Sequence, residues 1–368
     1  MEASEAKPVS WIFDAPCKND RLKKASAETA PKNAENFFIR QEEFGVLYYS
    51  KSKTPVFEES YFVDAHNPGS QFILSAPIIA ILEITGRCQL NCIHCYRPPE
   101  KKGKSLDLET IKRLIHELHS MGVVGVQFIG GEPFMHPDLP EMLREAKKLG
   151  MKTEVITNGF GITTSKIDEC SDLIDGLYVS LDGKREIHNR IRQNPKSFDF
   201  AVDTLKRFSD KGVYTKVIMT LNKLNYNDIE EVYSVSLHVG ARGVLLKRML
   251  PIGNGKNIDN LCLRKGVMED LEPRMRKIVD IRTALDTTGR CVDRFGAYTL
   301  FGCPGGRTQI VVDCDGNVFK CLYMKNPTDV LGNIFVSPFK DIWAKNNETL
   351  IRCNNCAFSD RCGGLCLL

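Results

Sequence analysis

The sequence predicts an α/β fold built on a partial (β/α)6 barrel, with a short β-hairpin arm before it and a cysteine-rich domain after it. Three observations support this fold class. Apolar runs alternate with amphipathic segments from residue 77 to residue 249, glycine-rich and polar motifs follow these runs, and eight of the 14 cysteines lie beyond residue 262. Such alternation is typical of a parallel sheet with right-handed crossovers, whose chemistry lies at the carboxyl ends of the strands.

Six short apolar runs are predicted to be the barrel strands. They cover residues 78–85, 125–129, 153–157, 177–181, 214–220 and 244–249. The segments between them carry apolar residues at helical spacing. Asp107 is expected to cap the first barrel helix and Gly122 to end it. At the next helix, Asp138 and Glu141 are expected to form a capping-box-like pair, and Gly150 to close the helix.

The chain divides into three expected domains. Residues 1–75 are predicted to be a leader and a β-hairpin arm, because residues 37–39 and 46–49 are aromatic or β-branched and residues 51–53 favour a turn. The barrel is expected to cover residues 76–285, and the cysteine-rich domain residues 286–368.

Composition excludes several classes of function. Charged residues make up 26% of the chain and hydrophobic residues 42%, and the net charge of +4 comes with no dense basic run, so we expect no nucleic-acid partner. Because no stretch approaches 18 consecutive apolar residues, no membrane-spanning helix is expected either. The polar N-terminus lacks the pattern of a signal peptide, which makes metal binding a better use of the cysteines than disulfides. We therefore expect a cytoplasmic protein.

Three cysteines directly follow the first predicted strand. Cys88, Cys92 and Cys95 have the spacing C-x3-C-x2-C. Three thiolates can hold three irons of a 4Fe–4S cube and leave the fourth iron open to a small molecule. The alternative is a structural zinc site, but zinc takes four closed ligands and normally uses C-x2-C pairs. The spacing therefore favours an iron–sulfur cluster.

Further motifs follow the other predicted strands, each at a strand end. They are Gly130-Gly131-Glu132-Pro133, Thr157-Asn158-Gly159, Ser180-Leu181-Asp182-Gly183 and Pro251-Ile252-Gly253. The glycine pair lets a ligand approach the backbone closely, and the Glu132 carboxylate suits a ligand ammonium group. Ser180 and Asp182 alternate along a strand end, so their side chains are expected to point the same way, toward sugar hydroxyls. Each motif alone is an ordinary turn, and the order of the motifs supplies the specificity.

This order across residues 77–260 resembles the radical S-adenosylmethionine (SAM) superfamily, whose core is a TIM-like partial barrel. The resemblance implies that Cys88, Cys92 and Cys95 bind a 4Fe–4S cluster. It assigns SAM contacts to the residues matching the family motifs, which are Gly130, Gly131, Glu132, Asn158, Ser180, Asp182, Arg192 and, through its backbone, His94. Two neighbours of Arg192, Asn189 and Gln193, depart from the family pattern. The implied chemistry is reductive cleavage of SAM to a 5′-deoxyadenosyl radical, which abstracts hydrogen from the substrate.

A second cysteine set lies near the end of the chain. It comprises Cys303, Cys321, Cys353, Cys356, Cys362 and Cys366. Its spacing is similar to the SPASM extension, which binds auxiliary 4Fe–4S clusters, although a zinc ribbon would also space Cys353 and Cys356 in this way. The resemblance assigns Cys303, Cys321 and Cys366 to one cluster, and Cys353, Cys356 and Cys362 to another.

The sequence leaves two ligands of these auxiliary clusters unassigned. The family pattern closes with a further cysteine, but this chain ends at Leu368, so we expect one or two auxiliary clusters. Cys291 is a candidate fourth ligand of the first cluster. Cys314 is an alternative, but its neighbours Asp313 and Gly316 predict a hairpin turn and favour a structural role.

The SPASM resemblance implies a peptide or protein substrate. We expect a maturase of a ribosomally made peptide that forms a thioether or carbon–carbon crosslink, served by a reductant such as flavodoxin or ferredoxin. Residues 1–75 are short for a leader-peptide recognition domain, which leaves room for a separate recognition protein.

Three alternatives remain at this stage. One is a small-molecule enzyme of cofactor or haem biosynthesis. Another is an anaerobic sulfatase-maturing enzyme, disfavoured because Leu322 stands where that group has an aspartate base. A non-enzymatic iron–sulfur scaffold would not need the glycine and aspartate motifs on one rim. The sequence assigns no residue as the substrate base.

Overall fold

The computed structural model describes residues 37–42, 45–50, 61–65, 74–97, 103–263 and 305–354, together with 267 and 271. These residues belong to two compact units. The smaller unit holds an N-terminal sheet, and the larger one holds the predicted barrel and part of the cysteine-rich region.

The N-terminal sheet has three antiparallel strands, β1 (Phe37–Glu42), β2 (Gly45–Ser50) and β3 (Tyr61–Ala65), in the order β1-β2-β3. The first two form the predicted hairpin, with Phe37 opposite Ser50. The third strand pairs with β2 and was not predicted. The turn expected at residues 51–53 lies outside the described residues.

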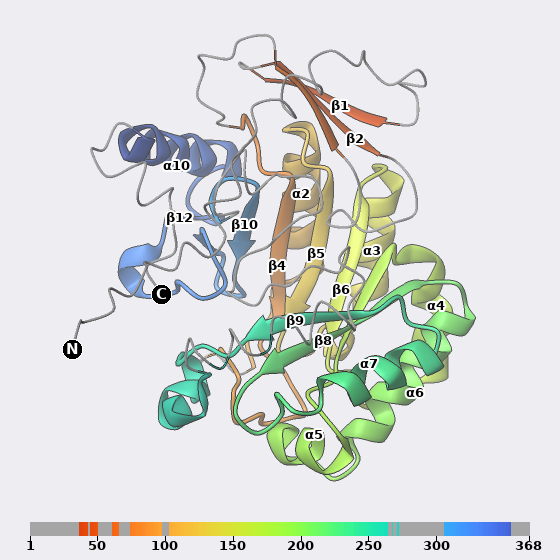
Figure 1. The fold of residues 1–368 in the computed structure, drawn as a ribbon. Helices are drawn as coiled ribbons and strands as arrows, with labels where there is room; N and C mark the ends of the chain where they lie inside the picture. Colours follow the sequence, from red (N-terminus) through yellow and green to blue (C-terminus); the bar gives the residue numbers. More distant parts are fainter. Residues whose placement is uncertain are drawn as a thin grey trace, which may run out of the picture. The chain divides into compact units, whose positions relative to one another are not determined.

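Six parallel strands form the centre of the larger unit (Figure 1). They are β4 (Ile79–Thr85), β5 (Gly125–Gly130), β6 (Lys152–Thr157), β7 (Gly176–Ser180), β8 (Tyr214–Leu221) and β9 (Val244–Arg248). They pair in chain order, and the six predicted strands are confirmed to within one residue at each end. Every residue of β4 is buried, which explains why the strand is apolar apart from Glu83 and Thr85, since a parallel strand is covered on both faces.

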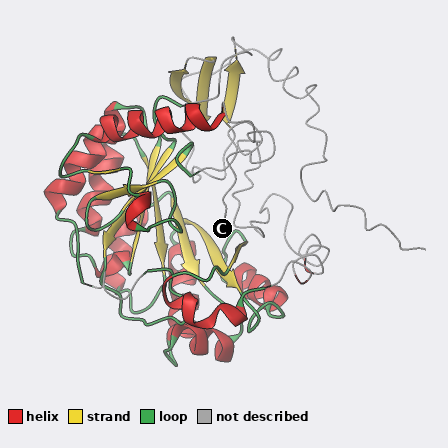
Figure 2. Cartoon of the chain, turned by 90° about the vertical axis from the view of Figure 1, so that its left-hand side faces the viewer, coloured by secondary structure: helices red, strands yellow, loops and turns green. Residues whose placement is uncertain are grey.

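Six α-helices connect the strands and lie along one side of the sheet (Figure 2). They are α2 (Leu108–Ser120), α3 (Leu139–Lys148), α4 (Thr164–Cys170), α5 (Arg185–Arg192), α6 (Ser197–Asp210) and α7 (Ile229–His238). Short 3₁₀ segments occur at Pro133–Met135, Ser171–Leu173, Gly253–Leu261 and Pro327–Asp329.

One predicted helix cap is confirmed and one is wrong. Asp107 accepts a hydrogen bond from the Thr110 N–H at 2.8 Å and caps α2 as expected. Asp138 makes no side-chain cap bond at α3. Its ψ of 13° is far from the extended conformation that lets an N-cap side chain reach the backbone of the first turn.

The C-terminal region extends the barrel sheet. Its elements are β10 (Gln309–Val312), β11 (Asn317–Phe319), β12 (Gly332–Asn333) and α10 (Phe339–Asn354). Strand β10 pairs in parallel with β4, which gives a nine-stranded sheet in the order β12-β11-β10-β4-β5-β6-β7-β8-β9. The hairpin turn predicted between β10 and β11 is confirmed, because the Gly316 N–H donates to the Asp313 carbonyl at 2.9 Å and Gly316 has a φ of +78°.

Barrel and C-terminal region share one hydrophobic core. Ile81 and Ile129 of the barrel pack with Val311 and Phe319 of the β10–β11 hairpin. Trp343 of α10 is 2% exposed, and its indole N–H donates to the Leu74 carbonyl at 3.0 Å. This shared core, together with the pairing of β10 and β4, holds the hairpin in a fixed position beside β4. Among the helices that the structure describes, none combines the length and the apolar content needed to cross a membrane.

Candidate functional site

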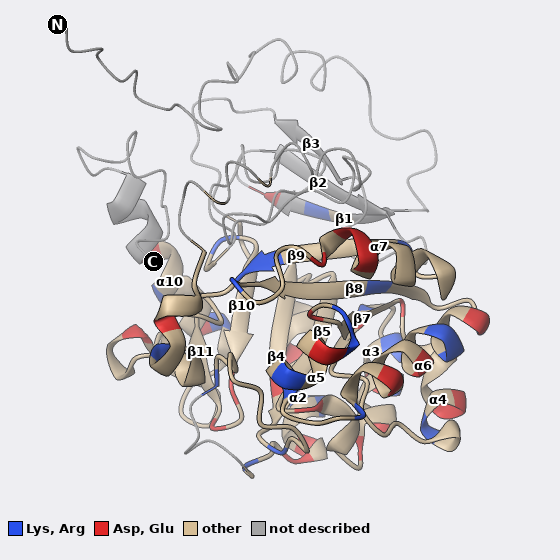
Figure 3. Cartoon of the chain, turned by 60° about the horizontal axis from the view of Figure 1, so that its bottom comes forward, with Lys and Arg blue, Asp and Glu red and all other residues tan. Residues whose placement is uncertain are grey.

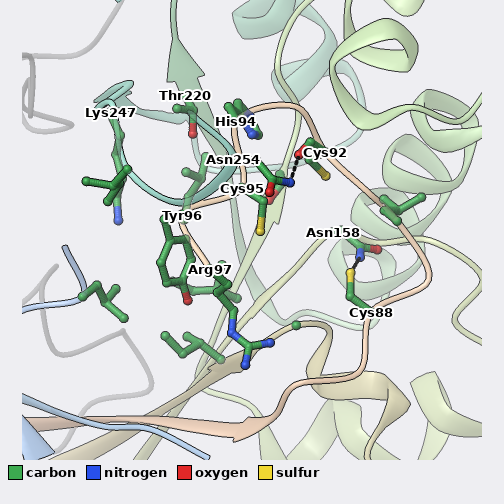
Figure 4. A pocket seen from close by; sticks show the side chains of 18 of the residues that line it. Cys88, Cys92, His94, Cys95, Tyr96, Arg97, Asn158, Thr220, Lys247 and Asn254 are labelled. Atoms are coloured by element: carbon green, nitrogen blue, oxygen red, sulfur yellow. Dashed lines mark hydrogen bonds between the residues drawn. The ribbon is translucent and has the colours of Figure 1, made fainter. Parts of the chain in front are cut away.

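The predicted motifs gather around one cavity at the carboxyl ends of the barrel strands (Figure 4). The cavity has a volume of about 200 Å³. Residues from the predicted motifs that line it are Cys88, Cys92, His94, Cys95, Gly130, Gly131, Thr157, Asn158, Ser180 and Arg192. Parallel barrels place their sites at this rim because every strand ends there with the same polarity.

The three cysteines of the loop after β4 all line this cavity. Asn158 Nδ2 is 3.5 Å from the Cys88 sulfur, and an Arg192 guanidinium nitrogen is 3.6 Å from the Cys92 sulfur. Among the described residues, no three Cys, His, Asp or Glu side chains converge as they would on a single metal ion. Three thiols on one loop are the donor set that a 4Fe–4S cluster takes, with each thiolate at a different iron.

The protonation of these thiols also bears on metal binding. Cys88 is exposed at the cavity, but the surrounding chain still desolvates its thiol and raises its pKa to about 11, and burial raises the pKa of Cys92 above its ordinary value. Both side chains are therefore neutral thiols at pH 7 until a metal displaces their protons. Iron binding at this loop is expected to release protons, because thiolates and not thiols are the ligands.

Other cavity groups fit a polar cofactor. Nδ1 of His94 and Nε of Arg192 are buried and have no hydrogen-bond partner among the described residues. Asn158, Ser180 and Thr220 add amide and hydroxyl groups to the lining. Buried polar atoms are normally paired, so unused ones at a cavity indicate a place where a ligand supplies the partner.

The glycine pair after β5 holds the cysteine loop from one side. The Gly131 N–H donates to the Thr85 carbonyl at 2.7 Å, and the Glu132 N–H donates to the Arg87 carbonyl at 2.8 Å. A Cβ at Gly131 would lie 2.2 Å from the Arg87 carbonyl oxygen, and one at Gly130 would lie 2.4 Å from the Thr85 carbonyl oxygen. Only glycine lets the two segments approach this closely just before Cys88.

The Gly131→Ala variant is expected to lose most of its cluster iron and to be less stable by about 2 kcal/mol, because the methyl group forces the loop away from β5. Iron per chain and the free energy of unfolding measure the two effects. Gly161→Ala is the matched control, since a Cβ there has no atom within 4 Å and only the left-handed φ of +69° opposes it. It should keep its iron. Normal iron in Gly131→Ala would show that the close contact is not needed.

A second turn, not singled out as a ligand-binding motif, holds the loop from the other side. The Asn254 N–H donates to the Cys95 carbonyl at 2.8 Å, and the Asn254 side-chain amide donates to the Cys92 carbonyl at 3.0 Å (Figure 4). Gly253, the last residue of the Pro251 motif, lies so close that a Cβ would be 2.3 Å from the Cys95 carbonyl oxygen. The turn formed by Gly253 and Asn254 after β9 thus positions two of the three cysteines.

The Asp182 carboxylate joins the cysteine loop to the barrel. It is fully buried and contacts His94 Nε2 at 2.9 Å and the Arg192 guanidinium at 2.6 Å, while the Thr220 N–H donates to it at 2.8 Å. Burial alone would raise the pKa of Asp182, but the Arg192 charge and His94 hold it far below its ordinary value. Asp182 therefore carries a charge that neutralises Arg192 beside Cys92.

Ser180 and Asp182 do not share one role. Ser180 ends β7 and lines the cavity, whereas Asp182 lies past the strand end and its carboxylate is turned to His94 and Arg192. Because β7 ends at Ser180, the alternating side-chain directions of a strand do not extend to Asp182. The described contacts give Asp182 a positioning role.

His188 supports the same turn from α5. Its Nδ1 accepts a hydrogen bond from the Asp182 N–H at 2.9 Å, and the ring is completely buried. Burial, together with the nearby Arg192 charge, lowers the pKa of His188 to about 3. His188 is therefore neutral at physiological pH, which the acceptor role of Nδ1 requires.

Acidifying the cluster-free protein from pH 7 to pH 5 is expected to cost about 2 kcal/mol of folding stability through His188. The pKa of His188 in the folded protein lies below its ordinary value of 6.5. Between these two values the unfolded chain binds a proton that the folded chain does not bind. The free energy of unfolding therefore decreases as the pH is lowered. His188→Gln should remove this share of the pH dependence in denaturant titrations. His119→Gln, at an exposed position of α2, should keep it. Equal responses of wild type and His188→Gln would contradict the assignment.

The Glu132 side chain organises the turn after β6. It is buried and accepts hydrogen bonds from the Thr157 hydroxyl at 2.7 Å, the Asn158 N–H at 2.8 Å and the Phe134 N–H at 3.1 Å. Burial raises the pKa of Glu132, and these hydrogen bonds partly offset the effect. The carboxylate therefore fixes Asn158, which in turn contacts Cys88.

A buried charge cluster absent from the sequence analysis joins the loop to the C-terminal region. Glu83 of β4 accepts a hydrogen bond from the Tyr96 hydroxyl at 2.9 Å, contacts the Lys325 ammonium and lies 3.9 Å from Arg97 Nε. The rings of Tyr96 and Tyr323 meet edge to face at 6.4 Å. The lone glutamate inside this apolar strand is the sequence signal that could have predicted such partners, because a buried charge requires them.

The second cysteine set is described only in part. Cys321 is half-buried, and the Tyr323 N–H lies 3.4 Å from its sulfur. Cys314 is buried, and an Arg97 guanidinium nitrogen lies 3.4 Å from its sulfur, which fits its expected structural role. Outside the described side chains lie Cys291, Cys303, Cys353, Cys356, Cys362 and Cys366.

Comparison with known families identifies the class of protein. Residues 82–235 match the model of the radical SAM superfamily, and residues 303–366 match that of SPASM, an iron–sulfur cluster-binding domain. The chain therefore belongs to the radical SAM superfamily and carries a SPASM domain. It is an enzyme whose cofactors are SAM and 4Fe–4S clusters.

Individual relatives share most of the chain. The Fe-coproporphyrin III synthase of Methanosarcina barkeri is 27% identical over 340 residues, covering 80% of this chain and 84% of that protein. The mycofactocin maturase MftC of Mycolicibacterium smegmatis is 27% identical over 320 residues, covering 80% and 79%. The crystal structure of SuiB from Streptococcus suis bound to the precursor peptide SuiA has a TM-score of 0.65 at 15% identity, covering 84% and 87%, and shows that the fold is shared.

Proposed function

We propose that this enzyme modifies a ribosomally made peptide or protein, with a thioether or carbon–carbon crosslink as the expected product. The observation that carries the proposal is the position of the SPASM segment. Leu322 and Tyr323, directly after Cys321, line the same cavity as Cys88, Cys92 and Cys95. A substrate in this cavity lies between the SAM site and an auxiliary-cluster cysteine. The similarity to a mycofactocin maturase supports the peptide class.

In this proposal, Cys88, Cys92 and Cys95 hold the SAM cluster, and Gly130, Gly131, Asn158, Ser180 and Arg192 line the place of SAM. When bound, the cluster supplies the electron that cleaves SAM to a 5′-deoxyadenosyl radical. The chain's own residues position and shield this chemistry. The Asp182–Arg192 pair fixes the loop, and apolar side chains such as Ile218, Met249 and Leu322 exclude water.

We also propose ligand sets for the auxiliary clusters. Cys303, Cys321 and Cys366 would hold one auxiliary cluster, and Cys353, Cys356 and Cys362 a second. The functional division places SAM chemistry in residues 76–285 and auxiliary clusters in residues 286–368. A cytoplasmic location, a flavodoxin-like or ferredoxin-like reductant and a separate leader-peptide recognition protein complete the proposal.

One observation favours a second candidate, the modification of a tetrapyrrole. Cationic side chains line the cavity, and the Fe-coproporphyrin III synthase resembles this chain over a similar share of its length. Cationic groups suit the propionate side chains of such a ligand. The anaerobic sulfatase-maturing alternative keeps its earlier objection, since Leu322 follows Cys321.

The test is a substrate assay with the anaerobically reconstituted full chain. The protein is mixed with SAM, a reductant and either candidate precursor peptides encoded beside its gene or iron coproporphyrin III. Mass spectrometry follows the substrate, and chromatography follows 5′-deoxyadenosine. A peptide that loses hydrogen as a new bond forms supports the proposal. Turnover of the porphyrin alone would replace it with the second candidate.

A further inference from the structure

A single buried carboxylate lies between the cysteine loop and the SPASM segment (residues 303–366). Helices α4, α6 and α7 carry charged residues (Figure 3), whereas the only charged residue of β4 is Glu83. Glu83 is 1% exposed. A carboxylate that is removed from water in this way requires hydrogen-bond donors and partners of opposite charge.

The partners of Glu83 come from two distant parts of the chain. Tyr96 and Arg97 directly follow Cys95 on the cysteine loop, and the Tyr96 hydroxyl donates to the carboxylate at 2.9 Å, while Arg97 Nε lies at 3.9 Å. The ammonium group of Lys325, in the SPASM segment, contacts the same carboxylate oxygen as the Tyr96 hydroxyl. One carboxylate therefore connects the cysteine loop to the SPASM segment.

Lys325 also packs against two aromatic rings. Its ammonium group lies 5.6 Å from the centre of the Tyr96 ring and 5.8 Å from the centre of the Phe319 ring. Its side chain is 12% exposed, and the attraction between a cation and an aromatic face is stronger when water is excluded. Because Tyr323 also meets the Tyr96 ring edge to face, two residues of the SPASM segment hold this one tyrosine.

A short turn fixes the backbone from which Lys325 extends. The Met324 N–H donates to the Cys321 carbonyl at 3.3 Å, and these two residues form an isolated β-bridge. The Tyr323 N–H lies 3.4 Å from the Cys321 sulfur. Lys325 follows this turn directly, so the position of its side chain depends on the backbone around Cys321.

Tyr96 transmits this position to Cys95, because the two residues are consecutive. The Cys95 carbonyl accepts a hydrogen bond from the Asn254 N–H at 2.8 Å. Cys95 is thus held by the turn after β9 at its carbonyl and, through Tyr96, by the SPASM segment. A shift of Tyr96 would move Cys95 as well, and a displacement of about 1 Å at a reacting centre is costly.

We propose that Lys325 is a positioning residue for the SAM cluster. Through Glu83 and Tyr96 it holds Cys95 in the position that the cluster requires, although Lys325 itself does not line the cavity. The SPASM segment then contributes to SAM binding without contacting SAM through this residue. The inference goes beyond the proposed function, because it applies to a peptide substrate and to a tetrapyrrole alike.

The test measures SAM binding to the anaerobically reconstituted and reduced full chain by electron paramagnetic resonance. The spectral change on adding SAM reports the cluster that binds SAM. The Lys325→Met variant is expected to bind SAM about tenfold more weakly, because a buried Glu83 carboxylate without its lysine displaces Tyr96. Lys340→Met, which removes an exposed lysine of α10, is the matched control and should bind SAM as the wild type does.

Two further variants identify the route from Lys325 to the cluster. The double variant Glu83→Gln/Lys325→Met removes both buried charges and keeps an acceptor for the Tyr96 hydroxyl, so it should recover most of the SAM affinity. Tyr96→Phe removes only the hydroxyl that contacts Glu83, and it should weaken SAM binding by about threefold. Iron per chain is measured for every variant.

The outcomes distinguish positioning from general support of the fold. Weaker SAM binding in Lys325→Met with unchanged iron, recovered in the double variant, supports the proposal. Lower stability with the SAM affinity and spectral change of the wild type would overturn it, and so would equal losses in Lys325→Met and the double variant. If Lys325→Met took up no iron, Tyr96→Phe would decide, with weaker SAM binding supporting the proposal and unchanged binding opposing it.

Discussion

The Cys88→Ala variant is expected to lose reductive cleavage of SAM completely and to bind about four irons fewer than the wild type. Cys88 is exposed at the cavity beside Asn158, and its loss leaves two thiols in a loop that needs three. Two thiolates cannot fix the cube with its open iron toward the cavity. The measurement is 5′-deoxyadenosine formed per chain, together with iron and sulfide content after anaerobic reconstitution.

A matched cysteine variant separates ligation from general damage. Cys262→Ala removes a half-buried thiol that is not part of the cavity lining, so iron content and SAM cleavage should stay at wild-type levels. If Cys88→Ala still produced 5′-deoxyadenosine, Cys88 would not be a cluster ligand. If Cys262→Ala lost its iron as well, the loss in Cys88→Ala would report folding and not ligation.

The barrel was predictable because its strands are buried on both faces. Burial of this kind requires continuous apolar runs, and glycines and helix caps mark where each run ends. The parallel pairing of β10 with β4 was not predictable in the same way. Gln309 and Ile79 are distant in sequence, and no local pattern records which strand covers the edge of a sheet.

The location of the site at the carboxyl ends of the barrel strands was predictable from the sequence. Most motif residues that line the cavity come from the ends of four neighbouring strands, β4 to β7, and the parallel sheet brings them together because all strands end at one edge. What the motifs do not contain is the direction of each side chain. Glu132 is turned to Thr157 and Asn158, and Asp182 to His94 and Arg192, because each buried carboxylate is held by the nearest donors.

Residues outside the motifs were not identified from the sequence for a related reason. Asn254 matters through two backbone carbonyls of the cysteine loop, and a single asparagine after a glycine carries no signal of such contacts.

The Asp182→Asn variant is expected to lower the free energy of unfolding by about 3 kcal/mol, the second large effect. Asparagine keeps the size of the side chain and an acceptor for the Thr220 N–H, but it leaves the buried Arg192 charge without its partner. The pH dependence has a defined sign. The pKa of Asp182 is held below its ordinary value of 3.8, so its stabilising contribution is present above that value and is lost as pH falls below it. The variant should lack this acid-dependent loss in denaturant titrations.

Two further variants decide whether charge pairing is the cause. Asp203→Asn, in an exposed pair with Arg207 on α6, should leave stability almost unchanged, because exposed pairs contribute little. The double variant Asp182→Asn/Arg192→Met should regain part of the loss, since it removes the unpaired charge as well as its former partner. Additive losses in the double variant would contradict the pairing argument, because two independent contacts, and not one neutralised pair beside Cys92, would then account for the stability.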